Sequence, residues 1–253
     1  MKALVTGLNG TVAPFLARSL SAAGHIVIPW NRSVVPIDDR DAARDFIRRE
    51  HPDWFFHVAT GSPAWAELAA GVCSREEIRF LFTSSVSVFS ASQCGPFTVD
   101  ILPKPDDDYG RYKLECEQRV RAARHDAVIV RLGWQIGATP GGNQMVDYLD
   151  RTFKTLGQID ASVHWYPACS FLSDTARSLM HMMQNFPPGL YHLDGNPGLS
   201  FYEIAAGLNR IHGEPWIVNP GTTPVQNSRM IDQRVQVGSI SEILQSAGRP
   251  ESS

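Results

Sequence analysis

Cysteine is scarce in this chain and long apolar runs are missing, and each shortage excludes a class of protein. The four cysteines are widely spaced and form no CxxC pair, so neither a disulfide framework nor a cysteine metal site is expected. The histidines show no metal-ligand spacing. No stretch of the 253 residues reaches the roughly 18 apolar residues that span a bilayer. We therefore expect reduced thiols, no bound metal and no membrane partner.

Charge is sparse and balanced. Charged residues make up 19% of the chain, and the formal net charge is −3. Arginines gather only at Arg48–Arg49 and Arg119–Arg124, in amphipathic stretches whose charges we interpret as solvated helix faces rather than a nucleic-acid site. Residues 2–6 read directly into a strand, without the longer apolar region of a secretory signal. We expect a cytoplasmic protein that binds no nucleic acid.

The chain does have a regular alternation of short β-like runs and helix-length amphipathic stretches. This order is typical of a parallel sheet with helices on both faces, and the length suffices for a well-buried core. The sequence therefore predicts a doubly wound, Rossmann-type α/β fold. The expected strands are 3–5, 26–30, 34–37, 54–59, 78–83 and 127–132, and the expected helices are 12–23, 38–50, a stretch from about 109, and 172–184.

The regular alternation of strand-like and helix-like stretches ends after residue 140. Gly141-Gly142, mixed short segments and Pro187-Pro188-Gly189 follow. We interpret this change as the start of a smaller lobe built from non-consecutive pieces. The expected division is a core of residues 1–140 with 166–186, and a lobe of residues 141–165 with 187–253.

A glycine-containing turn, TGLNGTVA at residues 6–13, follows the first expected strand and opens the first helix. Gly7 permits a tight turn, Gly10 lets a pyrophosphate approach the backbone, and Ala13 lets the helix pack closely on the strand. The amides and the positive dipole at the helix start would bind the phosphates. The turn predicts a dinucleotide site that includes Asn9, Thr11 and Val12. A strand–turn–helix without a ligand is the alternative interpretation.

The second expected strand ends in Trp30-Asn31-Arg32. No acidic residue is present there to accept a hydrogen bond from a ribose 2′-hydroxyl, whereas Arg32 suits the 2′-phosphate of NADP. With Asn31 and Arg32 beside the ribose, the sequence favours NADP(H), and NAD(H) is the alternative. Asp38 could accept from the adenine amino group, or could simply cap the helix that follows.

Tyr109 and Lys113 lie four residues apart on an expected helix, so their side chains share one face. A tyrosine with its ordinary pKa of about 10 is a weak acid-base group, and a nearby ammonium is expected to lower that pKa by favouring the phenolate. Tyr109 could then donate a proton to a carbonyl oxygen as a hydride arrives. The run FTSSVSVF at residues 82–89 offers hydroxyls that would hold the same oxygen.

Together these motifs resemble the extended short-chain dehydrogenases/reductases. The resemblance is narrower to the dTDP-4-dehydrorhamnose reductase (RmlD-like) branch of the NAD-dependent sugar epimerase/dehydratase superfamily, and it covers nearly the whole chain. The segments that carry it are residues 6–13, 36–40, 51–53, 84–89, 109–113, 130–137 and 189–193.

The resemblance implies roles for individual residues. Ser85 takes the place of the catalytic serine or threonine and Tyr109 that of the acid/base. Lys113 would position the nicotinamide ribose and tune the tyrosine, whereas Tyr112 is expected only to pack. Further residues expected at the cofactor are Ala59, Thr60, Gly61 and Leu132, and those expected at the substrate are Ser85, Ser87, Trp134 and Arg229.

Two departures from the family pattern bear on the substrate. The stretch from Ala59 to Ser84 is shorter than its family counterpart, so one helix and its loop are expected to be trimmed. The late Arg-Pro-x-Asn-Ser pattern is only partly present at residues 223–228, where Arg229 is the candidate replacement for the missing arginine. His57 is expected to be packed, and residues 164–166 either contact a sugar ring or belong to the core.

The resemblance implies an NAD(P)H-dependent reductase that acts on a keto group of a nucleotide-activated sugar or related small carbonyl compound. The alternatives are an epimerase or dehydratase with tightly bound NAD, and a non-catalytic cofactor-sensing or regulatory subunit. The missing acid after the second strand argues against the first alternative, and the presence of Tyr109 and Lys113 argues against the second. A homodimer is compatible with the resemblance.

Overall fold

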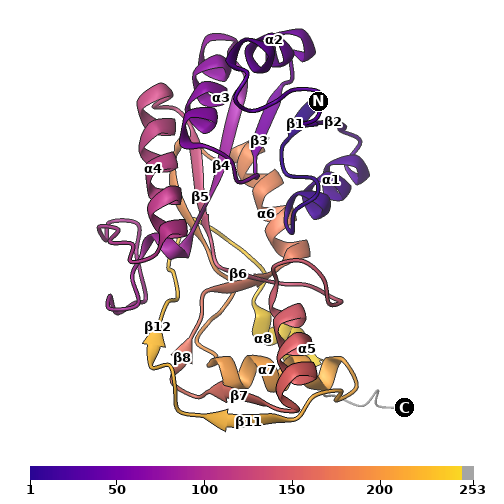
Figure 1. Cartoon of the computed structure of the whole chain (residues 1–253), viewed down its shortest axis with the longest axis vertical. Coiled ribbons are helices and arrows are strands. Elements are labelled where there is room, and N and C mark those ends of the chain that lie inside the picture. Colours follow the sequence, from indigo (N-terminus) through magenta and orange to yellow (C-terminus); the bar gives the residue numbers. More distant parts are fainter. Residues whose placement is uncertain (247–253) are drawn as a thin grey trace. The chain divides into compact units, whose positions relative to one another are not determined.

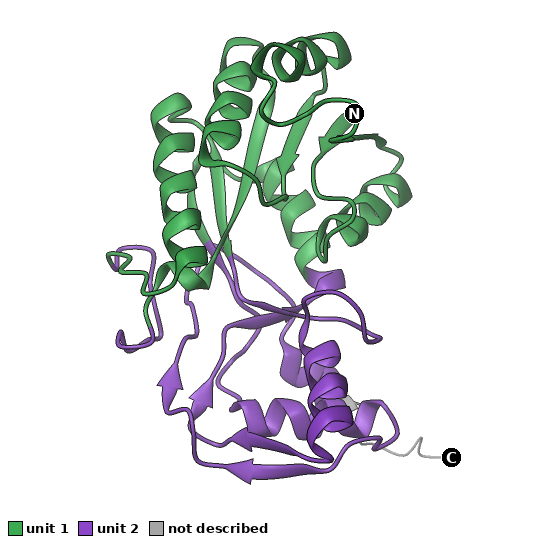
Figure 2. Cartoon of the chain, viewed as in Figure 1, with its two compact units in different colours: residues 1–90, 102–131, 175–191 green, residues 91–101, 132–174, 192–253 purple. Residues whose placement is uncertain are grey.

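The structure is a computed structural model that describes residues 1–246, and Figure 1 labels its elements. The chain divides into two compact units, coloured separately in Figure 2. Unit 1 comprises residues 1–90, 102–131 and 175–191, and unit 2 comprises residues 91–101, 132–174 and those from 192 on.

Unit 1 is built on a six-stranded sheet with the order β10-β5-β4-β3-β1-β2. The strand β1 pairs in parallel with β2 and β3, and β3 pairs in parallel with β4. The strand order therefore reverses between β1 and β3: β2 lies on one side of β1, and β3, β4 and β5 follow on the other. Ligands of such sheets bind beyond the carboxyl ends of the strands at this reversal. The bounds are β1 Lys2–Val5, β2 Ile26–Pro29, β3 Trp54–His57, β4 Arg79–Ser85, β5 Val128–Leu132 and β10 Gly189–Leu193.

Helices cover both faces of this sheet. The helices α2, α3 and α4 lie side by side on one face, and α1 and α6 lie on the other (Figure 1). Phe55, Phe80 and Phe82 point from the strands into the layer beneath α2–α4 and form the main core with Trp65. The predicted Rossmann-type fold is confirmed. The bounds are α1 Ala13–Ala22, α2 Arg40–Glu50, α3 Pro63–Arg75, α4 Asp108–Ala123 and α6 Leu172–Asn185.

The strand expected at residues 34–37 is wrong, because this segment is a turn. The carbonyl of Asn31 accepts from the amides of Val34 and Val35 at 3.1 and 2.9 Å. The Asn31 side chain accepts from the amide of Ser33 at 3.0 Å. Val34 is 71% exposed, so the apolar pair does not supply a buried strand face, and the sheet ends at β2.

A helix occupies the stretch that was expected to be trimmed. In α3, the Ser62 side chain caps the first turn by accepting from the amide of Trp65 at 3.1 Å, and Pro63 takes the first helical position. The helix itself carries small and apolar residues on nearly all of its sides. Its sequence therefore lacks the clear periodic pattern that marks an amphipathic helix. The Ser-Pro start was the available signal.

Unit 2 combines short parallel strand pairs with three helices around its own core. Its pairs are β6–β9, β7–β11 and β8–β12, and buried residues such as Leu149, Ile159 and Ile204 fill the core. The bounds are β6 Trp134–Ile136, β7 Ile159–Ser162, β8 Trp165–Tyr166, β9 Cys169–Phe171, β11 Val218–Gly221, β12 Gln226–Asn227, α5 Met145–Leu156, α7 Phe201–Ile211 and α8 Ile240–Ser246.

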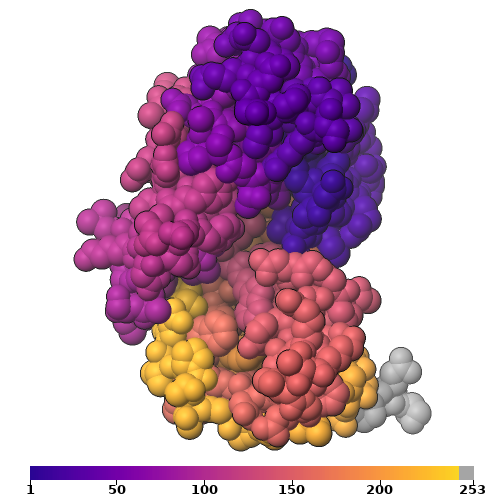
Figure 3. Space-filling model, viewed as in Figure 1, coloured from indigo at the N-terminus to yellow at the C-terminus, as the bar shows by residue number. Residues whose placement is uncertain are grey.

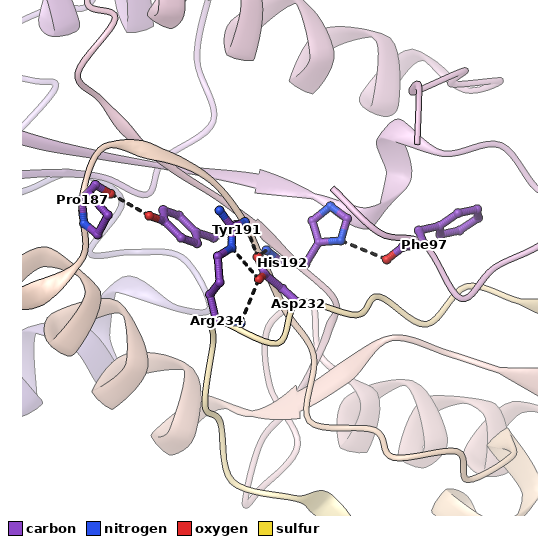
Figure 4. A network of polar contacts seen from close by, with 6 residues as sticks. All are labelled: Phe97, Pro187, Tyr191, His192, Asp232 and Arg234. Carbon is purple, nitrogen blue, oxygen red and sulfur yellow. Dashed lines mark hydrogen bonds and ion pairs between the residues drawn. The ribbon is translucent and has the colours of Figure 1, made fainter. Parts of the chain in front are cut away.

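Residues 91–101 pack within unit 2, although they come between two segments of unit 1. Phe97 is buried, its amide donates to the carbonyl of Arg229 at 2.7 Å, and its carbonyl accepts from Ile231 at 2.8 Å. The same carbonyl lies 3.1 Å from Nδ1 of His192 (Figure 4), so this nitrogen carries the proton.

A carboxylate fixes His192 from its backbone side. The amide of His192 donates to Asp232 at 3.2 Å, and Arg234 binds the same carboxylate at 2.7 Å (Figure 4). The domain bounds expected from the sequence stay a prediction. The compact units differ from them in placing residues 91–101, 132–140 and 166–174 in unit 2 and residues 187–191 in unit 1.

A close approach fixes the start of α4 against the one-turn helix η1 (Val86–Val88) in unit 1. A Cβ atom added at Gly110 would overlap the backbone carbonyl of Ser87 and would lie 2.9 Å from the Cβ of Pro105. Only glycine therefore allows α4 to pack at this depth.

We predict that Gly110→Ala lowers the free energy of unfolding by about 3 kcal/mol, because overpacking against a backbone carbonyl cannot be relieved by side-chain rotation. The matched control is Gly71→Ala in α3, where a Cβ would meet nothing closer than 3.6 Å. That change should raise the free energy of unfolding by about 0.5–1 kcal/mol through helix propensity. Urea denaturation measures both, and equal effects of the two variants would contradict the close approach.

Candidate active site

The turn after β1 has the backbone that a dinucleotide phosphate site needs. Gly7 has a φ of +84°, and the amide of Gly10 donates to its carbonyl at 2.7 Å. A Cβ at Gly7 would lie 3.1 Å from the backbone of Ala59, so a side chain there would both strain the turn and press on the segment after β3. Asn9, Thr11 and Val12 lie in the same turn and at the start of α1.

The first turn of α1 lacks the side-chain cap that its neighbours have. Its N-cap residue, Val12, has no side chain that could accept a hydrogen bond, whereas α2, α3 and α4 are capped by Asp39, Ser62 and Asp107. Pro14 has no amide hydrogen, and the amides of Phe15 and Leu16 donate to the carbonyl of Val12, both at 3.1 Å. The helix start therefore suits an anion through its positive dipole and through the absence of a capping side chain that would compete for the site. Together with the glycine backbone, this arrangement fits the pyrophosphate of a dinucleotide.

Contacts between Thr6 and His57 connect the glycine turn after β1 to the segment after β3. The hydroxyl oxygen of Thr6 accepts from the amides of Val58 and Ala59, both at 3.0 Å, and lies 3.1 Å from Nδ1 of His57. Burial, together with the charges of Lys113 and Arg32, lowers the pKa of His57 to about 3. His57 is therefore a neutral, buried partner of Thr6, and hydrogen bonds of Thr6 connect residues 57–59 to the start of the glycine turn.

The residues expected around the adenosine end gather on two loops of unit 1. Arg32 follows β2, and its guanidinium donates to the carbonyl of Thr60, next to Gly61. Asp38 is exposed and caps nothing, because the cap of α2 is Asp39, which accepts from the amide of Ala42 at 2.9 Å. The cap interpretation of Asp38 is therefore wrong by one residue.

Lys113 is deeply placed in the middle of α4. Its ammonium donates to the carbonyl of Thr83 at 2.9 Å and lies 5.8 Å from the centre of the Tyr109 ring. Burial lowers the pKa of Lys113 to about 8, although Cys116 and Glu117 favour the charged form. The ammonium is thus retained at neutral pH against an unfavourable desolvation.

Tyr109 lies one turn before Lys113 and is 46% exposed, and its phenol interacts with the hydroxyl of Ser85. Burial raises the pKa of Tyr109 above its usual value, and the bond from Ser85 only partly offsets this. The expectation that Lys113 lowers the Tyr109 pKa is therefore wrong for the unliganded chain. The physical reason is that desolvation of the phenolate dominates, while the ammonium is directed to the Thr83 carbonyl.

Ser85 ends β4 and also shapes the turn that follows. Its oxygen accepts from the amide of Ser87 at 3.1 Å, and its hydroxyl lies 3.1 Å from that of Ser87. The structure therefore brings the two predicted hydroxyls together beside Tyr109.

Sequence reasoning missed the role of Tyr112, which was expected only to pack. Its hydroxyl accepts from the amide of Gly61 at 2.9 Å, so α4 holds the loop after β3 in addition to carrying Tyr109 and Lys113. The signal in the sequence was a glycine at position 61. The structure explains it, because a Cβ there would press on the ring of the buried Trp65.

The remaining predicted substrate residues belong to unit 2. Trp134 stacks on Trp165 and Phe201, each with ring centres 5.9 Å apart, and meets Tyr148 edge-on at 5.3 Å. Arg229 donates to the carbonyl of Pro197 at 2.7 Å. Leu132, expected at the cofactor, is buried at the end of β5.

The described part of the chain has neither a candidate metal site nor a candidate membrane-spanning helix. Within residues 1–246 there is no group of three or more histidine, cysteine, aspartate or glutamate side chains that could hold a metal ion. In the same range, no helix has both the length and the apolar character required to cross a bilayer.

Sequence comparison identifies relatives over most of the chain. SpsK, a spore coat polysaccharide biosynthesis protein of Bacillus subtilis, is 24% identical over 227 residues, which cover 82% of this chain and 78% of SpsK. The dTDP-4-dehydrorhamnose reductase of Mycolicibacterium smegmatis is 26% identical, with 86% and 71% covered. The 2′-dehydrokanamycin reductase of Streptomyces kanamyceticus is 29% identical, with 89% and 70% covered.

Structural comparison finds the same fold. The dTDP-4-dehydrorhamnose reductase of Bacillus anthracis, solved in complex with NADP, superposes with a TM-score of 0.83 at 19% identity, covering 96% of this chain and 97% of that one. The sequence profile of the RmlD substrate binding domain matches residues 1–253. The chain therefore belongs to the RmlD substrate-binding-domain family and is an RmlD-like extended short-chain dehydrogenase/reductase.

Proposed function

We propose that this chain reduces a keto group on a nucleotide-activated sugar, or on a related small carbonyl compound, with NADPH as the cofactor. Membership of an NAD(P)-dependent oxidoreductase family supports the reaction class. The names of the relatives support the substrate class, since they include dTDP-4-dehydrorhamnose reductase and dTDP-4-keto-6-deoxy-D-glucose reductase.

The observation that carries this proposal is the hydroxyl pair formed by Tyr109 and Ser85, with Lys113 one helical turn away. Two hydroxyls that interact with one another can both donate to a single carbonyl oxygen placed between them. A bound NADPH supplies the hydride for the adjacent carbon. The chain itself has to hold the oxygen and deliver a proton to it.

Tyr109 is suited to deliver that proton. Because burial raises its pKa above the usual value of 10.0, the phenol is protonated at neutral pH and can donate when negative charge develops on the carbonyl oxygen. The Ser85 hydroxyl, which favours the ionised form of Tyr109, then stabilises the phenolate that remains.

Lys113 is suited to hold both the phenolate and the cofactor ribose. An ammonium has three donors, and one of them is used on the carbonyl of Thr83. The other two can reach ribose hydroxyls, while the positive charge favours the ionised product form of Tyr109. At the other end of the cofactor, the glycine turn and the open start of α1 would bind the pyrophosphate, and Arg32 the 2′-phosphate.

We predict that Tyr109→Phe lowers kcat by at least about 100-fold, the usual contribution of a positioned acid, and changes the Kd of NADPH by less than about twofold. NADPH oxidation with a panel of dTDP-4-keto sugars measures the first quantity, and fluorescence titration the second. Undiminished turnover in this variant would remove Tyr109 from the mechanism.

The same substitution one turn along the helix face should behave differently. Tyr112→Phe removes the acceptor of the Gly61 amide but leaves Tyr109 in place. We expect the KM for NADPH to rise by about two- to tenfold, as for the loss of one hydrogen bond, with kcat nearly unchanged. A fall in kcat equal to that of Tyr109→Phe would contradict this separation of roles.

Lys113 should favour activity at the expense of stability. Its pKa falls from 10.5 to about 8 on folding. Below about pH 8 the folded chain therefore buries a charged ammonium that is fully solvated in the unfolded chain, and this desolvation lowers the free energy of unfolding. Between these two values only the folded form releases its proton, and this group makes the free energy of unfolding rise with pH.

We therefore predict that Lys113→Met abolishes turnover without lowering Tm at about pH 7, because the uncharged side chain fills the same volume without the desolvation of an ammonium. The Tm difference from the unmodified protein should shrink when thermal unfolding is repeated at about pH 10, where the folded protein has released the proton. A Tm several degrees below that of the unmodified protein at both pH values would show that the charge stabilises the fold.

The NADPH preference rests on Arg32. At a concentration of 100 times its Kd, a ligand stabilises a protein by about 2.7 kcal/mol. We expect NADPH to raise Tm more than equimolar NADH does, and Arg32→Gln to remove the difference. Equal shifts for both cofactors with the unmodified protein would defeat the preference.

A further inference from the structure

Arg32 is held by two features of the segment that follows β3, and neither is explained by the chemistry of reduction. We propose that the Thr60 carbonyl and the face of Trp65 form a seat that orients the Arg32 guanidinium toward a ribose 2′-phosphate. Trp65 is then a positioning residue for cofactor choice. The inference rests on the proposed NADPH dependence and adds the residue that makes Arg32 selective.

The contacts of Arg32 define the seat. One guanidinium nitrogen donates to the Thr60 carbonyl, and the guanidinium carbon lies 5.1 Å from the centre of the Trp65 ring, within the range of a cation–π interaction. A hydrogen bond in the guanidinium plane and a ring beneath it together fix both the position and the tilt of the group. A flexible arginine is thereby pre-organised before any ligand arrives.

Trp65 is itself held rigidly. It is 1% exposed, and its ring meets those of Trp30 and His57 edge-on, with centres 5.3 and 4.4 Å away. On a further side, a Cβ at Gly61 would lie 2.5 Å from the ring. The Ser62 cap fixes its backbone at the start of α3. The ring cannot turn away from Arg32 without disturbing the main core.

The charge of Arg32 is not neutralised by the protein. Among the described residues it forms no ion pair with a carboxylate, and its field reaches far enough inward to lower the pKa of His57. Four of the five guanidinium N–H donors remain after the bond to Thr60. A planar cation with open donors on an exposed loop suits the bidentate binding of a phosphate.

The alternative is that Arg32 merely covers an aromatic core residue, as many surface arginines do. The two interpretations differ in what Trp65 should affect. If Arg32 only covers Trp65, changes at Trp65 should alter the stability of the fold and should change the affinities for all ligands by the same factor. A seat predicts that they weaken only those ligands that carry the 2′-phosphate.

The test measures binding of two fragments, adenosine 2′,5′-bisphosphate and AMP, by isothermal titration calorimetry. For Trp65→Phe, whose smaller ring is a weaker cation–π partner, we expect bisphosphate affinity to fall about two- to fivefold with AMP affinity unchanged. The matched control is Trp54→Phe, another buried indole, which packs on His25 and Phe56 instead. This control should change neither affinity.

A second variant avoids the core in case Trp65→Phe fails to fold. Arg32→Lys retains the charge on an exposed residue but lacks the planar fork, so bisphosphate affinity should fall by a similar factor with AMP unchanged. If Trp65→Phe, or Arg32→Lys where Trp65→Phe does not fold, retains the full bisphosphate preference while Arg32→Gln loses it, the seat is refuted and the proposed NADPH dependence stands. If the unmodified protein binds both fragments equally, the proposed cofactor preference and the seat both fail.

Discussion

The depth at which α4 packs on the end of β4 is the constraint on which the site depends. Gly110 lets the helix rest against the backbone of Ser87, and the ammonium of Lys113 ties the next turn to the carbonyl of Thr83. In this arrangement the phenol of Tyr109 lies beside the hydroxyl of Ser85. A helix displaced outward by one side chain would keep the fold and separate the two hydroxyls.

Burial opposes the ionisation of Tyr109, His57 and Lys113, and the site depends on this effect. Burial raises the pKa of Tyr109, so the phenol keeps the proton it must donate, and burial holds His57 neutral as a fixed partner of Thr6. Of these three groups, Lys113 is the one that retains a charge at neutral pH, at the expense of stability. Such local conflicts between stability and chemistry are typical of functional sites.

The sequence predicted those features of unit 1 that depend only on residues close together in the chain. The glycine turn and the four-residue spacing of Tyr109 and Lys113 each depend on neighbours along the chain, and both lie where the patterns indicated. The failures have tertiary causes. The segment 34–37 has β-forming residues but folds back on Asn31. The Tyr109 pKa depends on desolvation by the folded chain, which no spacing rule contains.

Diffraction from crystals soaked with NADPH tests the central claim most directly. The account predicts density for the pyrophosphate at the amides of residues 7–13, the 2′-phosphate at Arg32, and the nicotinamide beside the Tyr109 and Ser85 hydroxyls. A dinucleotide bound in this orientation with the Tyr109 oxygen directed away from the nicotinamide would contradict it, and so would a fully occupied dinucleotide anywhere else on the chain.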